Sequence, residues 1–125
     1  MVLLGITPII QVLRGVIHDV EDLETKLWMI NANKTIDDIL LRQELHDLAS
    51  HVGPDRFQHH YCLSKAPEDW EHSKGRIDFE MMKKHLPPPG DDSLILICGP
   101  EPMIEAVLKP SLLLLGWSMD SVVIF

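Results

Sequence analysis

The residues with the clearest chemical potential lie where short apolar runs end. Cys98-Gly99-Pro100 closes the apolar run over residues 94–98, Ser64-Lys65 follows a second run, and Gly5-Ile6-Thr7-Pro8 follows a third. A short apolar run stopped by Gly-Pro predicts a buried strand that turns into a helix. Ligands of parallel sheets bind beyond the carboxyl ends of the strands. The three groups would then share one binding edge.

These stretches also have plainer interpretations, and the residues alone leave both open. Gly99-Pro100 can be only a turn and Cys98 only a small core residue. A helix that begins at Pro8 offers free N–H groups to an anion, although most helix N-termini bind only water or a cap. A nucleotide across this edge could place its pyrophosphate at that helix and its ribose or phosphate near Lys65.

Other common site chemistries have little support in the sequence. The seven histidines show no His-Glu-x-x-His spacing, so we expect no metal site. His59 and His60 are neighbours on a predicted strand and should point to opposite faces. No Gly-x-Cys elbow supports a cysteine nucleophile. Cys62 and Cys98 fit neither a disulfide framework nor a zinc motif, which favours a reducing compartment.

Composition and charge narrow the class of protein further. The chain has 125 residues and 46 % hydrophobic residues, which suits one domain with a real core. A formal net charge of −8 argues against nucleic acid or an anionic membrane as the main partner. No apolar stretch approaches the roughly 20 residues of a membrane span. The apolar start at Met1 lacks a basic flank, and its abruptness suggests a fragment or a short isoform.

Hydrophobic periodicity predicts strands and helices in strict alternation. We expect strands over residues 2–4, 26–32, 56–63, 94–98 and 122–125, and helices over 8–19, 37–51, 78–86 and 102–108. Pro110 should break or kink the last helix. This order predicts a three-layer, doubly wound α/β fold with a five-stranded, mostly parallel sheet, in one domain over residues 1–125.

An ordered set of motifs closely resembles the C-terminal NADH-binding domain of NADH–cytochrome b5 reductases, within the ferredoxin–NADP reductase superfamily. The resemblance covers nearly the whole chain, so residues 1–125 are expected to be a pyridine-nucleotide-binding domain. It implies an enzyme that passes electrons from NADH through FAD to a heme protein such as cytochrome b5. The motifs are Gly5-Ile6-Thr7-Pro8, residues 31–35 with 38–42, residues 66–70, residues 85–89, residues 98–103 and the terminal Phe125.

The resemblance also implies roles for individual residues. Thr7 and Pro8 match the pyrophosphate-binding turn, Cys98 matches a cysteine beside the hydride path, and Phe125 matches a terminal aromatic residue near the flavin. A glycine at position 99 would let the backbone approach the nicotinamide closely. The expected cofactor-binding residues are Gly5, Thr7, Pro8, Asn33, Ser64, Lys65, Gly99, Pro100, Met103 and Phe125, with Cys98 as the catalytic candidate.

Three departures from the family pattern change these expectations. The flavin-binding β-barrel and its Arg-x-Tyr-Ser/Thr motif are absent from the chain, so we expect it not to hold FAD tightly by itself. The family turn Gly-Gly-Thr-Gly-Ile-Thr-Pro is cut to one glycine, Gly5, which removes positions of close approach to the phosphates. Ser64, followed by Lys65, stands where the family places an aspartate, so NADP(H) should compete better with NAD(H).

Three functional hypotheses remain at this point. The chain is the nucleotide-binding half of a flavin reductase, a non-catalytic variant of that domain, or an α/β interaction module of shared ancestry. The ordered motifs favour the first two, and the missing barrel favours inactivity of the isolated chain. The resemblance further implies a location at the cytoplasmic side of a membrane or in soluble form inside the cell, since family members often associate with the endoplasmic reticulum or mitochondria.

Overall fold

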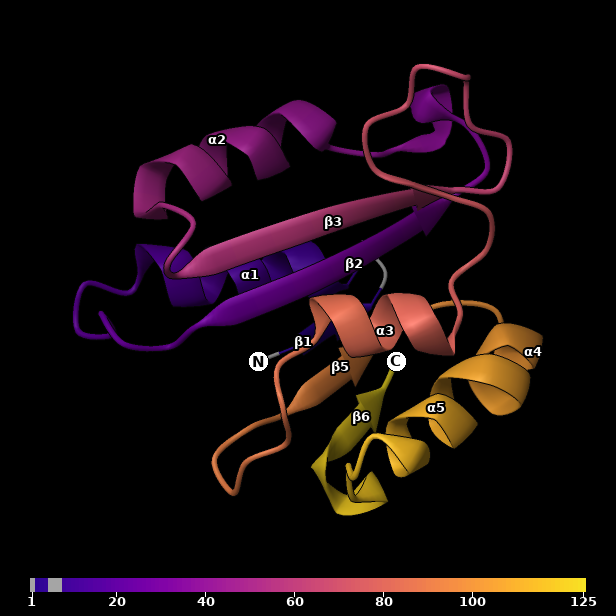
Figure 1. Cartoon of the computed structure of the whole chain (residues 1–125). Helices are drawn as coiled ribbons and strands as arrows, with labels where there is room; N and C mark the ends of the chain where they lie inside the picture. The colour runs from indigo at the N-terminus through magenta and orange to yellow at the C-terminus, as the bar shows by residue number, and fades with distance from the viewer. Residues whose placement is uncertain (1, 5–7) are drawn as a thin grey trace.

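The computed structural model describes the backbone of residues 2–4 and all of residues 8–125. The expectations made for Gly5 and Thr7 lie outside these residues. Strands and helices alternate along the chain except over residues 57–74, where two strands follow each other directly (Figure 1). The strands are β1 Val2–Leu4, β2 Leu27–Asn33, β3 Phe57–Leu63, β4 Ser73–Lys74, β5 Ile95–Ile97 and β6 Val122–Ile124. The α-helices are α1 Ile9–His18, α2 Arg42–Val52, α3 Phe79–His85, α4 Glu101–Met103 and α5 Lys109–Leu114.

The strands form one parallel sheet in the order β4-β3-β2-β1-β5-β6. The expected α/β fold with a parallel sheet is confirmed, and each of the five expected strands is present. The sequence did not indicate β4, a two-residue strand that lengthens the sheet beyond β3. Two residues carry no readable period, so this strand exists only through its pairing with β3.

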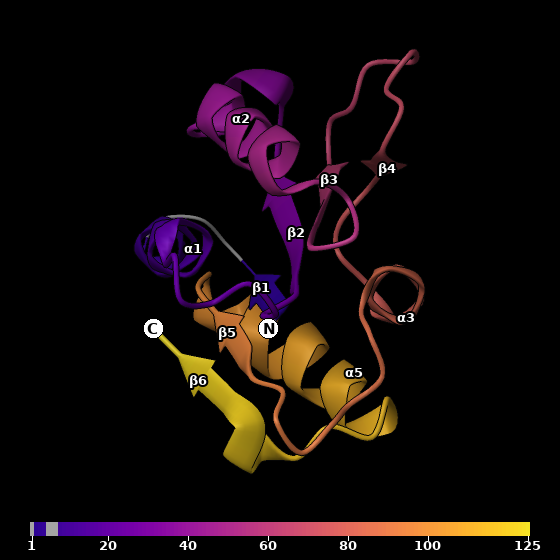
Figure 2. The same ribbon diagram turned by 90° about the vertical axis from the view of Figure 1, so that its left-hand side faces the viewer.

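Helices cover both faces of the sheet and make three layers (Figure 2). Side chains alternate along the strands, as a pleated backbone requires. On β2, Leu27 and Met29 join the core under α1 and α2, whereas Ile30 joins the core under α3 and α5. On β3, Tyr61 and Cys62 divide in the same way. The sheet therefore separates two hydrophobic cores, each closed by its own helices.

The start of α2 differs from the expected one. The sequence predicts a helix from Asp37 or Asp38, but residues 36–38 form a 3₁₀ turn and α2 begins at Arg42. The Asp38 carboxylate accepts hydrogen bonds from the Thr35 N–H (3.0 Å) and hydroxyl (2.8 Å), which closes the turn on itself. Leu41 then adopts a left-handed backbone (φ 56°) that reorients the chain before α2.

Pro110 does not end the last helix. The helical run continues from Glu101 through Leu114, with a π-helical segment over Ile104–Leu108 just before the proline. The Lys109 N–H donates to the Ile104 carbonyl, five residues back. A proline lacks an N–H and crowds the preceding turn of an α-helix. The wider π turn accommodates both effects, so the helix changes its hydrogen-bond register and does not break.

Two further findings concern the expected elements. Asp78 starts α3 as predicted, because its carboxylate accepts a hydrogen bond from the Met81 N–H at 2.9 Å. In the described part of the chain, no helix combines the length and the apolar character needed to cross a membrane.

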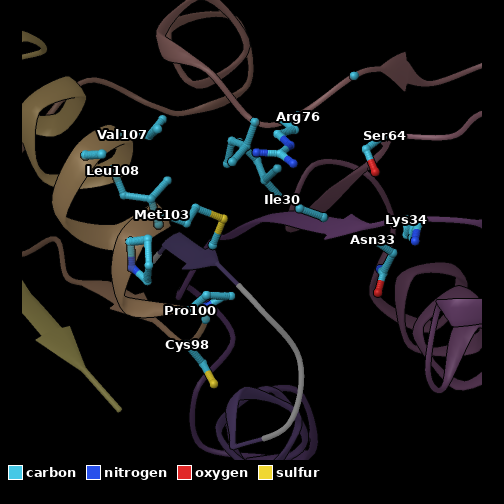
Figure 3. Close-up of a pocket in the computed structure, with 16 residues that line it drawn as sticks. Ile30, Asn33, Lys34, Ser64, Arg76, Cys98, Pro100, Met103, Val107 and Leu108 are labelled. Carbon is cyan, nitrogen blue, oxygen red and sulfur yellow. The ribbon is translucent and has the colours of Figure 1, made fainter.

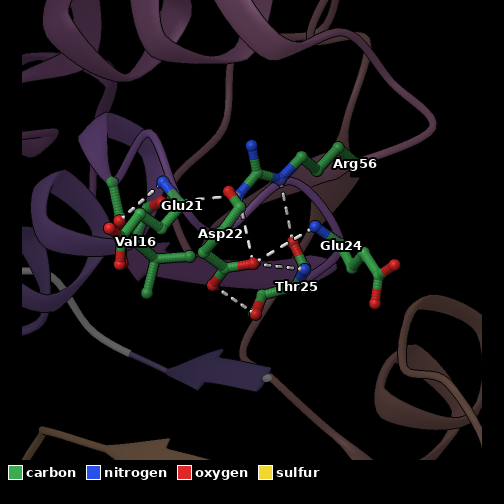
Figure 4. A network of polar contacts seen from close by, with 7 residues as sticks. Val16, Glu21, Asp22, Glu24, Thr25 and Arg56 are labelled. Atoms are coloured by element: carbon green, nitrogen blue, oxygen red, sulfur yellow. Dashed lines mark hydrogen bonds and ion pairs between the residues drawn. The ribbon is translucent and has the colours of Figure 1, made fainter.

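Arg56 anchors the loop between α1 and β2 (Figure 4). Its guanidinium donates to the main-chain carbonyls of Asp22 (2.7 Å), Thr25 (3.0 Å) and Val16 (3.4 Å), and its side chain is only 14 % exposed. The Asp22 carboxylate in turn accepts from the Thr25 hydroxyl and N–H, which lowers the pKa of Asp22. This network connects the end of α1 with the entrances to β2 and β3.

We expect Arg56→Met to lower the free energy of unfolding by about 2–4 kcal/mol, since it leaves several carbonyls without their charged donor. Urea denaturation of the two proteins measures the difference. Arg14→Met is the matched control, because Arg14 pairs with Glu44 across α1 and α2 but is 39 % exposed. Equal losses in the two variants would contradict the special role of Arg56.

Candidate functional site

A cleft of about 670 Å³ lies at the carboxyl edge of the sheet (Figure 3). The ends of β2, β3 and β5, the segment after β4, and the helical run after β5 surround it. Its lining residues are Ile30, Ala32, Asn33, Lys34, Ser64, Gly75, Arg76, Ile77, Cys98, Gly99, Pro100, Pro102, Met103, Ala106, Val107 and Leu108. The edge that the sequence predicts for binding is therefore the edge that is hollowed.

Expected site residues divide between this cleft and its surroundings. Asn33, Ser64, Cys98, Gly99, Pro100 and Met103 line the cleft. Lys65, Pro8 and Phe125 do not line it, and Gly5 and Thr7 lie outside the described residues. Pro8 stands immediately before α1, which covers the opposite face of the sheet from α3.

The pairing of β2 with β3 continues into the loops and aligns one side of the cleft. The Ser64 N–H donates to the Asn33 carbonyl at 3.0 Å, and the Lys65 N–H donates to the Lys34 carbonyl at 2.8 Å. The Asn33 amide donates to the Asn31 side chain at 3.0 Å, and Asn31 is only 2 % exposed. This bond orients the Asn33 side chain, whose oxygen remains available to accept a hydrogen bond.

Arg76 and Lys34 are lining residues that the sequence did not single out. Arg76 reaches the cleft because the neighbouring Gly75 takes a positive φ (100°) and donates its N–H to the Leu63 carbonyl at 2.8 Å. Ile77 is 5 % exposed and fixes the other end of this segment in the core. A glycine followed by a buried isoleucine is a weak local signal, and only β4 pairing shows that it borders a site.

The cleft is cationic although the chain is acidic. Lys34 and Arg76 are its charged lining residues, and no Asp or Glu is among the lining residues of the described chain. Ser64 and Asn33 add a hydroxyl and an amide beside these cations, and Met103 and Val107 form an apolar surface across the cleft from Ser64 and Lys34 (Figure 3). An apolar wall facing cations and neutral hydrogen-bonding groups suits a ligand that has both a flat apolar ring and anionic or hydroxyl groups.

Gly99 and Met103 both line the cleft and lie in close contact with each other. A Cβ added at Gly99 would lie 2.6 Å from the Met103 Cε, so any larger residue would displace this side chain. Pro100 is extended (φ −61°, ψ 137°), and its carbonyl accepts the Met103 and Ile104 N–H groups, both at 3.1 Å. The loop after β5 is thus held closely against the start of the helix that follows it.

Cys98 lines the cleft and also contacts the α1 side of the same sheet edge, where Phe125 ends the chain. The Cys98 side chain packs against the core under α1, and its thiol points away from Met103 (Figure 3). The Phe125 N–H donates to the Ile97 carbonyl at 2.9 Å, which continues the β5–β6 pairing to the last residue. Phe125 is 54 % exposed. Cys98 therefore borders both the cationic cleft, which it lines, and the α1 face of the sheet edge, whereas Phe125 does not line the cleft.

The described residues contain no group of three His, Cys, Asp or Glu side chains arranged to hold a metal ion. The cleft is better suited to an organic ligand, because its polar groups are two cations, an amide and a hydroxyl.

The two thiols should differ sharply in reactivity. Cys62 is 1 % exposed, and burial raises its pKa to about 11, whereas Cys98 is half-buried at the sheet edge. Thiolate is the reacting form, so we expect Ellman's reagent to modify one thiol per native chain rapidly. Cys98→Ser should remove the rapid phase and Cys62→Ser should keep it. Equal rates for both thiols in the native protein would contradict this assignment.

Comparisons with known proteins show that this chain is similar in sequence to NADH-cytochrome b5 reductases. The chain is 44 % identical over 121 residues to NADH-cytochrome b5 reductase 2 of Mus musculus, an alignment that covers 97 % of the chain and 43 % of that protein. The chain thus spans less than half the length of this curated relative.

The fold is also similar to that of solved reductase structures. The cytochrome b5 reductase domain of Ulva prolifera nitrate reductase superposes with a TM-score of 0.91 at 33 % identity, over 99 % of this chain and 47 % of that one. A ferredoxin NADP+ reductase from Neisseria gonorrhoeae, at 16 % identity and a TM-score of 0.73 over 99 % of this chain and 54 % of that one, shares the fold. A family model described as the oxidoreductase NAD-binding domain matches residues 4–109. The chain, which is homologous to the NADH–cytochrome b5 reductases over this region, therefore belongs to the oxidoreductase NAD-binding domain family.

Proposed function

We propose that this chain is the nucleotide-binding half of an NADH–cytochrome b5 reductase-like flavoprotein. The cationic cleft at the carboxyl edge of the sheet supports this most directly, because Lys34, Arg76 and Ser64 converge there opposite an apolar wall. A dinucleotide needs both features, one for its phosphates and ribose hydroxyls and one for the faces of its rings. Homology to reductases that use NADH adds independent support.

The binding mode that we propose divides the nucleotide between the two surfaces of the edge. Lys34, Arg76, Ser64 and Asn33 would bind the ribose and phosphate oxygens of the adenosine half, whose ring would pack on the apolar wall of the cleft. The segment Gly5–Pro8 would bind the pyrophosphate at the start of α1, as the family resemblance implies. Lys65 follows Ser64 and would contribute positive charge from outside the cleft lining.

Cys98, Gly99 and Pro100 would lie beside the nicotinamide, with the Met103 side chain packed against Gly99. Bound NADH supplies a hydride to FAD, which then passes single electrons to a heme acceptor. This chain's contribution is positioning, since the Met103 side chain occupies the place of a Cβ at Gly99 and the extended Pro100 stiffens the loop after β5. The half-buried Cys98 would exclude water from the hydride path.

The residues of this chain that fit a flavin are few. Cys98 and the exposed Phe125 offer an apolar surface at the α1 face, but no charged side chain lies beside them in the β5–β6 pairing. We therefore propose that a flavin-binding domain joined to this one supplies most FAD contacts, and that a heme protein such as cytochrome b5 accepts the electrons. A location inside the cell, as for the family, is part of the same proposal.

Calorimetric titration of the 125-residue chain tests the core of this proposal. We expect NADH to bind with or without FAD, and FAD alone to bind weakly. Arg76→Gln should weaken NADH binding about tenfold, or about 1.4 kcal/mol, by removing a charged donor from the cleft. Arg14→Gln on α1 is the matched control and should leave the affinity unchanged. No heat with NADH in any combination would favour a non-catalytic domain.

Ser64 should set the choice between the two pyridine nucleotides. The described cleft lining has no carboxylate to repel a 2′-phosphate, so we propose that NADPH binds within about tenfold of NADH. Ser64→Asp should weaken NADPH at least tenfold while changing NADH little, because the new carboxylate repels only the extra phosphate. Ser64→Asn is the neutral control. A strong NADH preference of the unaltered chain in parallel titrations would contradict this proposal.

A further inference from the structure

Three histidines from different segments meet beside β4. His60 of β3 and His85 at the end of α3 stack with ring centroids 3.6 Å apart and planes 14° apart. His72, just before β4, lies edge-on to His60 at 5.4 Å. The His60 Nε2 and the Ser73 hydroxyl are hydrogen-bonded at 2.6 Å. We call His60, His72 and His85 the histidine triad.

The histidine triad holds the strand that leads into one wall of the cleft. β4 has two residues, and they pair only as Ser73 with Cys62 and Lys74 with Leu63. Ser73 is further held by the Trp70 indole, which donates to its carbonyl at 3.1 Å. The next three residues, 75–77, line the cleft. Such a short edge strand gains little from its ladder, so its side-chain contacts decide whether it stays docked.

The charges around the triad oppose its protonation. Lys84 on α3 acts on His60 and His85, Arg42 at the start of α2 acts on His72, and His59 on β3 acts on His60. Glu71 is the acidic neighbour that favours a charged His72. Burial, the largest cause, lowers the pKa of all three rings and brings that of His60 to about 4. At neutral pH the rings are therefore uncharged and can stack.

We propose that the histidine triad is an acid-sensitive latch on the nucleotide cleft: its neutral rings keep β4 docked on β3, and their protonation releases β4 together with the cleft wall at residues 75–77. Charging stacked rings places like charges within a few ångströms of each other beside Lys84. Because His60 and His85 belong to β3 and α3, undocking β4 does not separate the stacked rings; it removes Ser73 from His60 and lets water solvate and screen their charges. The consequence for nucleotide affinity rests on the proposed function, whereas the latch itself does not.

The direction of the pH effect follows from proton linkage. The docked state binds protons less readily than the released state, whose histidines titrate near the ordinary pKa of about 6.5. Release therefore takes up protons as the pH falls below about 6.5, and docking is fully favoured above it. Each proton taken up changes the release equilibrium about tenfold per pH unit within this window.

Amide hydrogen exchange followed by NMR from pH 7.5 to pH 5 measures the latch directly. The Gly75 N–H, which donates to Leu63, should lose protection at least tenfold per pH unit below about 6.5. The Trp70 indole signal should shift in the same range, because its acceptor is the Ser73 carbonyl. Amides of β2 should stay protected. Parallel loss of protection in β2 and at Gly75 would show global unfolding and overturn the latch.

Two substitutions at His85 separate charge from packing. His85→Phe keeps a ring on His60 but cannot be protonated. Release of β4 should then take up about one proton fewer, so the plot of the logarithm of the Gly75 protection factor against pH should be less steep by about one unit. His85→Arg carries a permanent charge and should lower Gly75 protection at least tenfold already at pH 7.5. His51→Gln, a histidine on α2 outside the triad, should behave as the unaltered chain. Unchanged Gly75 protection in both His85 variants would overturn the proposal.

NADH titrations over the same pH range distinguish this proposal from the proposed function. If NADH binds, its dissociation constant should rise on acidification in step with the released fraction measured at Gly75, about tenfold when nine chains in ten are released, and it should rise less in His85→Phe. If NADH does not bind at any pH while Gly75 still loses protection, the proposed function fails and the latch stands. NADH binding with no pH-dependent change at Gly75 would leave the function intact and refute the latch.

Discussion

The parallel pairing of β2 with β3 is the constraint on which the rest of the site depends. It is in register over all seven residues of each strand, from Leu27 opposite Phe57 to Asn33 opposite Leu63. The same pairing continues beyond the strands through the Ser64 and Lys65 N–H groups. Because parallel strands end at the same edge, this register brings a hydroxyl, an amide and a cation together.

The two sides of the cleft are held by interactions of different strength. Asn33, Lys34 and Ser64 lie at the ends of β2 and β3. The side chains of these two strands pack into the hydrophobic cores on both faces of the sheet, which fixes their position. Arg76 instead depends on β4, which is short and stands at the edge of the sheet. A rigid side that positions the ligand and a side that can yield is a common arrangement for a binding site, since the ligand must enter.

The carboxyl edge of the sheet has one surface on the α1 face and another on the α5 face, and β5 lies between them. Its residues alternate between the two cores, so Cys98 packs on the α1 side while Ile97 packs on the α5 side. Gly99 follows at the crossing point, and Met103 fills the space that a side chain there would need. A nucleotide that extends from the cationic cleft to the surface beside Cys98 and Phe125 would have to pass Gly99, where the Met103 side chain occupies the place of a Cβ.

Local pattern alone determined five of the six strands, the buried faces of the helices, the Asp78 cap and the edge at which the cleft lies, because apolar periodicity and capping act over a few residues. It also indicated Cys98, Gly99, Pro100 and Ser64, which stand at strand ends. Tertiary structure alone decided the start of α2, the π turn before Pro110, the pairing of β4, and the positions of Arg76 and Lys34 in the cleft. The reason is physical: each depends on a partner distant in sequence or on a competing hydrogen bond, such as Leu63 for Gly75 or Asp38 for Thr35. Periodicity shows which side of a segment is buried, but not which neighbour buries it.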